Sequence, residues 1–171
     1  MEDLSMTGPA SLPRRALSVR QPWAWAIMHA GKNVENRTRI SVRRGNMMIG
    51  GIAIHAAGGM TQKEYEYAAK FIKSVSGLDV PRPCHLPRGG IVGAVNVVAL
   101  VEKSLSPWFV GPVGLLLDSP RTVEFIPCSG QLGYFAWKED PTHTAETLKW
   151  MMLWGQNSAP IGGDGAPSIL L

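Results

Sequence analysis

The chain has 171 residues, a formal net charge of +4, 45% hydrophobic residues and 18% charged residues. These proportions exclude an intrinsically disordered chain, and the length allows one well-formed hydrophobic core. No apolar run approaches the roughly 20 residues of a membrane-spanning helix, and the N-terminal stretch lacks the apolar core of a secretory signal. Two cysteines are too few for a disulfide framework and lack metal-ligand spacing, so we expect a cytoplasmic protein without a metal or cofactor.

The middle of the chain, residues 16–137, is predicted to form one folded domain. Strands at short spacing with two or three interspersed helices indicate an α+β fold, a small mixed β-barrel rather than a layered sheet of βαβ units. In chain order, the expected elements are a strand over 16–20, a helix over 22–30, strands over 33–38 and within 47–56, a helix over 61–77, and strands over 91–102, 113–117, 122–126 and 134–137.

Short motifs set the expected ends of these elements. Pro22 suits the first position of a helix, where its missing N–H needs no partner, and Gly31 suits a left-handed helix end. Thr61, followed three residues later by Glu64, is the capping-box pattern of a helix start. The pair Gly50-Gly51 indicates a bulge or a sharp bend within a strand.

The later strands of the domain carry two further expectations. The run over 91–102 is nearly all apolar, which predicts that both faces of this strand are covered. The tetrapeptide at 118–121, Asp-Ser-Pro-Arg, has the composition of a turn, and we expect it to separate two strands.

Both flanks of the domain differ from it in composition. Residues 1–15 contain glycine and proline and predict a flexible leader, and the Gly/Pro-rich residues 156–171 predict a flexible tail. Between the domain and the tail, residues 138–155 are expected to form an appended amphipathic helix that packs on the barrel or on a protein partner. Its large apolar residues are Leu148, Trp150, Met151, Met152 and Trp154.

Polar and charged side chains gather around the first helix, where we expect them to bind a ligand. Alternate residues of a strand share a face, so Glu35 and Arg37 are expected to form an ion pair that lines the same concavity as Lys32 and Gln21. A carboxylate beside cationic donors can read the edge of a nucleobase or act as a general base, and the sequence leaves both uses open beside a purely structural ion pair. The whole set is Arg20, Gln21, Lys32, Glu35 and Arg37.

Aromatic and basic residues extend this candidate site. Trp23 and Trp108 are candidates to stack on a base, although Trp23 also has core spacing, and Ser106 lies in the same segment as Trp108. His55, at the end of an apolar strand, is either a ligand contact, an acid–base group or a hydrogen-bonded histidine at the barrel rim. A basic cluster is expected to contact a nucleic-acid backbone and comprises Arg39, Arg43 and Arg44.

The segments over 17–25 and 31–37 resemble the opening of the ASCH domains, small β-barrel modules of the PUA-like superfamily. The family signature places a lysine two residues after a glycine, a glutamate three residues beyond the lysine, and an arginine two further on. Lys32, Glu35 and Arg37 fit this spacing, with Ala30 in the glycine position and Gly31 displaced by one. Further matches extend the resemblance over residues 16–137 and lie at 44–45, 52–56, 89–93, 106–109 and 130–135.

The resemblance implies a PUA-like barrel and two kinds of enzyme to weigh against a binding module. Some ASCH proteins resemble amidohydrolases that act on an acylated cytidine through a lysine and a threonine. Here Lys32 fills the lysine position, but Glu35 stands in the threonine position and cannot serve as the same hydroxyl nucleophile. Others resemble ribonucleases, for which Lys32, Glu35 and His55 would form an acid–base set.

The sequence therefore predicts a module that binds nucleic acid, with RNA preferred, and recognises a nucleotide or a modified base in a cleft of the barrel. A hydrolase of RNA or of a modified nucleoside, acting in the same cleft, is the first alternative. A protein-interaction adaptor that uses the helix over 138–155 is the second alternative. The expected partners are RNA, another nucleic acid or a nucleotide, with no membrane, and a protein only through that helix.

Overall fold

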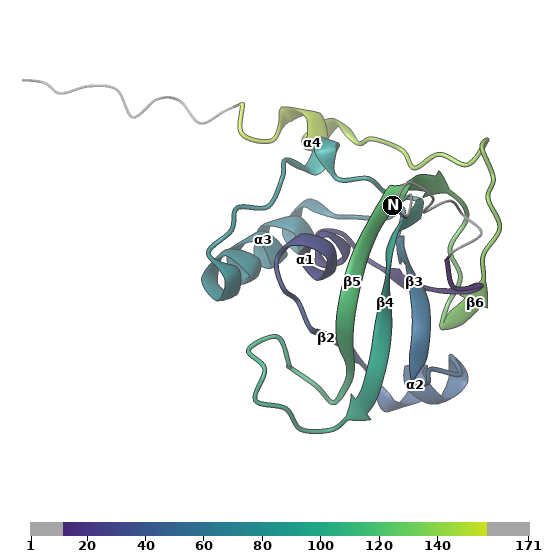
Figure 1. Cartoon of the computed structure of the whole chain (residues 1–171). Coiled ribbons are helices and arrows are strands. Elements are labelled where there is room, and N and C mark those ends of the chain that lie inside the picture. The colour runs from purple at the N-terminus through teal and green to yellow at the C-terminus, as the bar shows by residue number, and fades with distance from the viewer. Residues whose placement is uncertain (1–11, 157–171) are drawn as a thin grey trace, which may run out of the picture.

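The computed structural model describes residues 12–156, which form an α+β fold around one curled six-stranded sheet (Figure 1). Its strand order is β2-β5-β4-β3-β1-β6, in which β1 and β3 are parallel and the other neighbours antiparallel. This half-barrel confirms the predicted mixed α+β class. The strands are β1 (Arg15–Val19), β2 (Val34–Arg37), β3 (Gly50–Ala56), β4 (Gly90–Val101), β5 (Val113–Pro127) and β6 (Tyr134–Ala136). The helices are α1 (Trp23–His29), α2 (Arg39–Arg44), α3 (Gln62–Ser76), the 3₁₀ helix η2 (Pro83–His85) and α4 (Lys149–Leu153).

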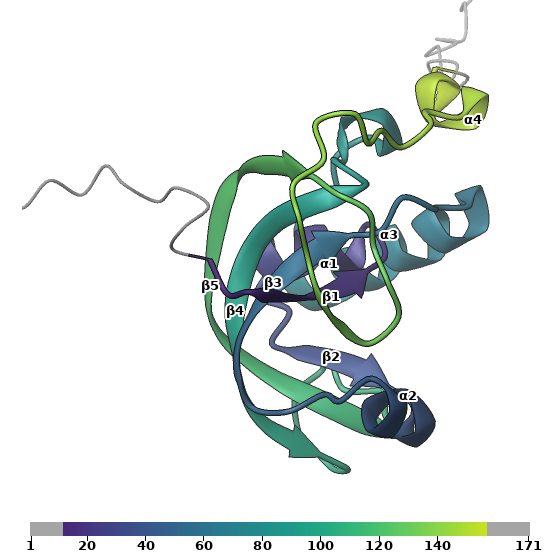
Figure 2. The same ribbon diagram turned by 90° about the vertical axis from the view of Figure 1, so that its right-hand side faces the viewer.

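Helix α1 fills the concave side of the sheet, and α3 packs on the side of α1 that faces away from the sheet (Figure 2). Ile27 of α1 belongs to the same buried cluster as Ile54 of β3. Ala26, one residue earlier, lies in a second cluster with Ala68 and Ile72 of α3. Apolar residues on two sides of one short helix thus join the sheet and α3 into a single core.

The predicted C-terminal ends of α1 and α3 and the predicted start of α3 are confirmed. Gly31 follows α1 with a φ of 72°, and Gly77 follows α3 with a φ of 75°, the left-handed conformation that glycine adopts without steric cost. Thr61 and Glu64 form the complete capping box of α3. Pro22 stands at the N-cap of α1, one position earlier than predicted.

The two strands expected on either side of residues 118–121 are one continuous strand, β5, so the predicted turn is wrong. Ser119 and Pro120 of β5 stand opposite the single residue Val95 of β4, so β5 carries one extra residue and bulges here. Both residues suit a bulge: Ser119 has a φ of 50°, and Pro120 has no N–H to donate to a neighbouring strand. Because β4 is long enough to pair on both sides of the bulge, turn-forming residues here bend a strand instead of ending it.

Two other strand predictions need correction. Gly50 and Gly51 begin β3 and pair regularly with β4, whereas the register shift of this strand pair lies between Ile54 and His55. Both faces of β4 are covered only in its first half, since the side chain of Val98 is 50% exposed. The far end of β4 extends beyond the helices that cover its beginning (Figure 1).

Helix α2 was not predicted from the sequence. The side chain of Thr38 accepts a hydrogen bond from the Ser41 N–H and caps the helix start. None of the α2 residues is buried, so no apolar periodicity marks this helix in the sequence. The basic cluster of Arg39, Arg43 and Arg44 lies entirely on α2.

The appended helix expected over 138–155 is restricted to the five residues of α4. The residues before it run as an irregular segment along one side of the molecule (Figure 2). Helix α4 packs on η2 and α3 rather than on the barrel, because Met151 is fully buried in a cluster with Tyr65, and the Trp154 ring lies 4.9 Å from the Tyr65 ring.

Most of the predicted leader, 1–15, and of the predicted tail, 156–171, lies outside the described residues. The part of the leader that is described packs against the fold. Leu12 belongs to a buried cluster with Phe135, and the indole N–H of Trp137 donates to the Pro13 carbonyl over 2.8 Å. Within the described residues, no helix is long and apolar enough to cross a membrane.

Replacing Met151 with alanine should lower the free energy of unfolding by about 2–5 kcal/mol, because it empties a fully buried position beside Tyr65. The neighbouring Met152 is 52% exposed, so Met152→Ala should change this free energy by about 0.5 kcal/mol or less. Urea denaturation of the three proteins measures both effects. Equal losses for the two variants would contradict the packing of α4 described above.

Candidate functional site

A chain of three charged groups, here called the buried charge chain although Arg37 is only partly buried, stands at the open side of the half-barrel, where the end strand β2 approaches β1. Glu35 is at its centre: one carboxylate oxygen lies 2.7 Å from Lys32 Nζ and the other 3.2 Å from Arg37 Nη2. Arg37 also donates to the Ser18 carbonyl of β1 over 2.8 Å. The predicted Glu35–Arg37 ion pair is therefore confirmed, and Arg37 connects β2 to β1 where no strand ladder does.

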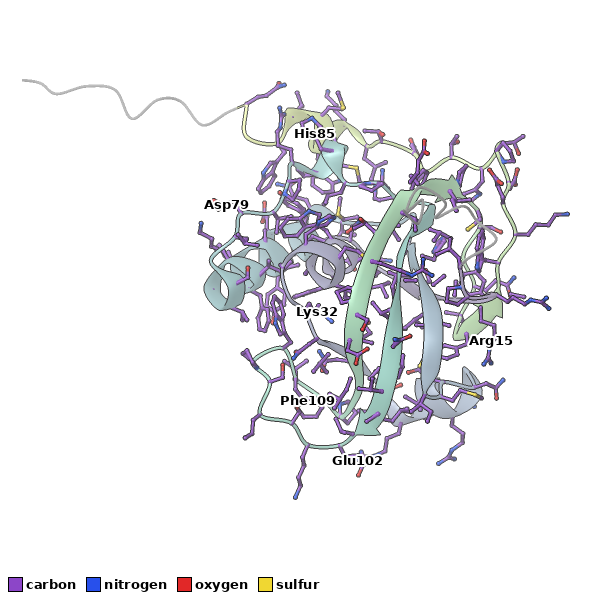
Figure 3. The ribbon with its side chains drawn as sticks, viewed as in Figure 1. Arg15, Lys32, Asp79, His85, Glu102 and Phe109 are labelled. Atoms are coloured by element: carbon purple, nitrogen blue, oxygen red, sulfur yellow. The ribbon has the colours of Figure 1, made fainter. Side chains whose placement is uncertain are left out.

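The three charged groups stabilise one another's ionised forms. Burial by itself raises the pKa of the Glu35 carboxyl, but the charges of Lys32 and Arg37 and their hydrogen bonds outweigh burial and lower that pKa. Glu35 is thus a carboxylate at neutral pH. Lys32 also donates to the Val34 carbonyl, and its ammonium lies 6.0 Å from the centre of the Trp23 ring. Figure 3 shows Lys32 inside the fold, whereas Glu102 projects from the surface.

A cavity of about 250 Å³, here called the aromatic pocket, opens above Lys32 and Glu35. Rings from α1, α3 and the loop after β4 surround it: the Phe71 ring lies 5.6 Å from the Trp23 ring and 6.0 Å from the Trp108 ring, and Tyr67 lies 6.4 Å from Trp23. Its lining residues are Trp23, Lys32, Glu35, Asn36, Tyr67, Phe71, Trp108 and Val110.

The loop that carries Trp108 is held in place by two asparagines of the β2 region. Asn36 donates to the Trp108 carbonyl over 2.9 Å and accepts from the Val110 N–H. Asn33 accepts a hydrogen bond of 2.6 Å from the Ser106 hydroxyl. Ser106 therefore positions this loop and is not a lining residue of the aromatic pocket, contrary to its predicted role as a ligand contact.

A second cavity, of about 570 Å³, is here called the arginine pocket. Arg37 lines it beside Arg20, which forms an ion pair of 2.7 Å with Glu64 of α3. The loop over 129–133 forms another wall. The full lining is Ser18, Arg20, Arg37, His55, Ala57, Gly58, Ser129, Gly130, Gln131, Leu132, Gly133 and His143.

His55 is buried at the base of the arginine pocket, with both ring nitrogens engaged. Nε2 lies 3.0 Å from the Cys128 carbonyl oxygen, which only accepts, so Nε2 carries the proton. Nδ1 then accepts from the Ser18 hydroxyl, also at 3.0 Å. Burial lowers the pKa of His55 below its ordinary value of 6.5, against the opposing effect of the Cys128 hydrogen bond, so the ring is neutral at pH 7.

The residues predicted to form one site are thus divided between two pockets. Lys32 and Glu35 line the aromatic pocket together with the two tryptophans, whereas Arg20, Arg37 and His55 line the arginine pocket. The prediction of a single concavity is wrong, and Lys32, Glu35 and His55 do not form one acid–base set. Glu35 and Arg37, which form one ion pair, line different pockets.

Gln21 does not contact either pocket. Its side chain is 2% exposed; the amide accepts from the Trp25 N–H of α1 and donates to the Pro87 carbonyl, each at 2.9 Å. The amide nitrogen and oxygen of Gln21 are therefore both hydrogen-bonded within the protein. The arginines of α2 also lie apart from both pockets, and Arg39 forms an exposed ion pair of 2.8 Å with Glu102.

Sequence reasoning missed several lining residues. Tyr67 and Phe71 are four residues apart on α3, and the side chain of Tyr67 is 66% exposed. Two aromatic residues four positions apart lie on the same side of a helix, and this spacing could have indicated an aromatic surface on α3. No sequence signal placed His143 or the loop over 129–133 beside Arg37, because these segments lie about a hundred residues apart in the chain.

No protein-family model matches the chain, and no curated protein matches it.

The buried, neutral state of His55 predicts a pH-dependent stability. The unfolded chain takes up a proton at His55 near pH 6.5, whereas the folded chain does so only at lower pH, so the free energy of unfolding should fall as the pH drops below about 6.5. The slope from this group is at most about 1.4 kcal/mol per pH unit.

Denaturant titrations between pH 7.5 and pH 5 measure this dependence. His55→Gln should be less stable at pH 7.5 and should lose the part of the slope that His55 contributes. His85→Gln is the matched control, since His85 is exposed, and it should keep the full slope. A slope unchanged in His55→Gln would contradict the neutral, buried state.

Proposed function

We propose that this chain is a nucleic-acid-binding module that takes a single base, preferably of RNA, into the aromatic pocket. The observation that carries the proposal is the ring of four aromatic side chains above a carboxylate held between two cations. Aromatic walls favour flat, apolar ring systems, and each stacking contact with a base is worth roughly 1–3 kcal/mol. The floor supplies the polar groups that would select one edge of that ring.

The chemistry of the floor favours a base that presents N–H donors. An ionised carboxylate offers about four acceptor positions, of which Lys32 and Arg37 occupy two, so Glu35 retains capacity for a donor from the ligand. The amino group of cytosine and the N1–N2 edge of guanine present such donors. Lys32 lies beside Glu35 and would attract a carbonyl oxygen on the same edge.

The resemblance to ASCH domains supports the same reading, because Lys32, Glu35 and Arg37 of its signature are the three members of the buried charge chain. The exposed arginines of α2 add a second kind of contact, to the phosphate backbone, which carries no information on sequence. In this proposal the aromatic pocket supplies specificity and α2 supplies general affinity.

The two alternatives have less support. The ribonuclease form of the hydrolase alternative relied on Lys32 and Glu35 acting with His55, which lines the other pocket, and the amidohydrolase form lacks its threonine, because Glu35 stands in that position. The adaptor alternative relied on an apolar helix after residue 138. There Met151 is buried against the chain itself and Trp150 and Trp154 pack on the same cluster, which leaves Leu148, Met152 and Leu153 as the exposed apolar residues of the segment.

Tyr67→Ala should weaken binding of cytidine or guanosine monophosphate roughly 5- to 150-fold by removing one stacking wall. Tyr67 is mostly exposed, so the variant should fold normally. Leu78→Ala, a partly exposed apolar position outside the pocket, is the matched control and should bind like the wild type. Quenching of tryptophan fluorescence measures the affinities, since Trp23 and Trp108 line the pocket.

Mass spectrometry of the same mixtures follows the fate of the ligand. Unchanged nucleotides and RNA are expected for a binding module. Conversion of any of them by the wild type would contradict the proposal in favour of the hydrolase alternative. Equal affinities of Tyr67→Ala and wild type for every nucleotide tested would remove the aromatic pocket from the binding site.

Affinity for single-stranded RNA should fall steeply with salt, with a log–log slope of about −0.7 for each phosphate contact. The double variant Arg43→Ala/Arg44→Ala should therefore reduce the slope by about 1.4. Lys73→Ala/Lys149→Ala removes the same charge from exposed positions outside α2 and should leave the slope unchanged. Equal slopes for all three proteins in fluorescence anisotropy would exclude α2 from the RNA contact surface.

A further inference from the structure

We infer that the arginine pocket binds a phosphate group, and that the ligand of the aromatic pocket is therefore a phosphorylated nucleotide rather than a free nucleoside. The second half of this inference rests on the proposed function. The first half depends only on residues that line the arginine pocket, which include two arginines, two histidines and the loop over 129–133.

The loop over 129–133 presents main-chain donors that the protein does not use. Its neighbours on both sides are hydrogen-bonded: the Cys128 N–H donates to the Gly89 carbonyl and the Tyr134 N–H to the Gly45 carbonyl. Within the described part of the chain, the N–H groups from Ser129 to Gly133 donate to no protein acceptor. Successive free N–H groups that line a cavity are a common way to bind an anion without a dedicated charged residue.

Two close contacts hold this loop in place. A Cβ at Gly130 would lie 2.6 Å from the His55 ring, so the loop rests directly on the buried imidazole. Gly133 has a φ of 68°, and a Cβ there would lie 2.4 Å from the Cα of Gly45. Because only glycines allow these contacts, the donors are held in position before any ligand arrives.

Arg37 brings a positive charge to the same cavity. Its Nη2 is bound to the Ser18 carbonyl and to Glu35. Arg20 adds a second, half-exposed guanidinium whose donors are only partly used by Glu64.

The other charged groups around the pocket do not oppose an anion. Glu35 and Glu64 are each bound to an arginine of the pocket. His143 also lines the pocket, and the Asp140 carboxylate beside it accepts hydrogen bonds from Thr142. The neutral His55 contributes no charge and serves to support the loop. A phosphate oxygen would therefore meet donors from Arg37, Arg20 and the loop over 129–133.

One ion pair joins a lining residue of each pocket. Glu35 lines the aromatic pocket, Arg37 lines the arginine pocket, and 3.2 Å separates the carboxylate oxygen from the guanidinium nitrogen. A base above Glu35 and a phosphate beside Arg37 are thus neighbours and fit two parts of one nucleotide. This arrangement would make the phosphate a determinant of affinity, together with the base.

The first experiment compares a nucleoside, its 5′- and 3′-monophosphates and inorganic phosphate by calorimetry on the full chain. One of the monophosphates should bind at least about tenfold more tightly than the nucleoside. Arg20→Gln should reduce this ratio, while Lys73→Gln, which removes an exposed cation from another ion pair of α3, should preserve it. Tyr67→Ala should weaken nucleoside and monophosphate by the same factor.

The second experiment reads the loop directly through its amide resonances in ¹H–¹⁵N spectra. Inorganic phosphate alone should shift the resonances of residues 129–133, in the wild type and in Tyr67→Ala. If these resonances stay unchanged with phosphate and with both monophosphates, and nucleoside and monophosphates bind equally, the inference is wrong although the proposed function survives. If phosphate shifts the loop but no nucleoside or monophosphate binds, the phosphate site is supported and the proposed nucleotide ligand is wrong.

Discussion

The site depends on one buried carboxylate. Glu35 lies on the end strand β2, and the cations on either side of it, Lys32 and Arg37, come from the start and the end of the same short segment. Burying three charges is costly unless each is paired, so removal of any one would leave its neighbours without compensation. Arg37 extends the chain to the Ser18 carbonyl and connects β2 with β1 across the open side of the half-barrel. The group that forms the candidate site is therefore also part of what holds the sheet curled.

The same charge chain separates two environments with different chemistry. On one side, rings from α1, α3 and the loop after β4 enclose an apolar space in which Glu35 and Lys32 are the charged groups of the lining. On the other side, two arginines, two histidines and the loop over 129–133 line a wider cavity. Charges in the first space are poorly screened and favour precise hydrogen bonding, whereas the second can hold a hydrated anion.

Glycines and a neutral histidine build the wider cavity. Gly133 approaches Gly45 so closely that neither position can accept a side chain without movement, and Gly130 rests on the His55 ring. The hydrogen bonds of His55 to Ser18 and Cys128 use both of its nitrogens, which explains its burial without a role in proton transfer. Backbone held in place by close packing thus lines much of this cavity.

Local signals in the sequence determined the mixed α+β class, the ends of α1 and α3, and the pairing of Glu35 with Arg37. Each of these depends on residues a few positions apart: a capping box, a glycine with positive φ, and the alternation of a strand. Only the tertiary structure decided that the residues of the predicted site line two separate pockets. It also decided that the Gln21 side chain is hydrogen-bonded within the protein, and that residues 118–121 form a bulge instead of a turn. Those outcomes depend on which segments meet across the sheet, and a pattern read along the chain carries no information on contacts between residues as far apart as Arg37 and Gly130.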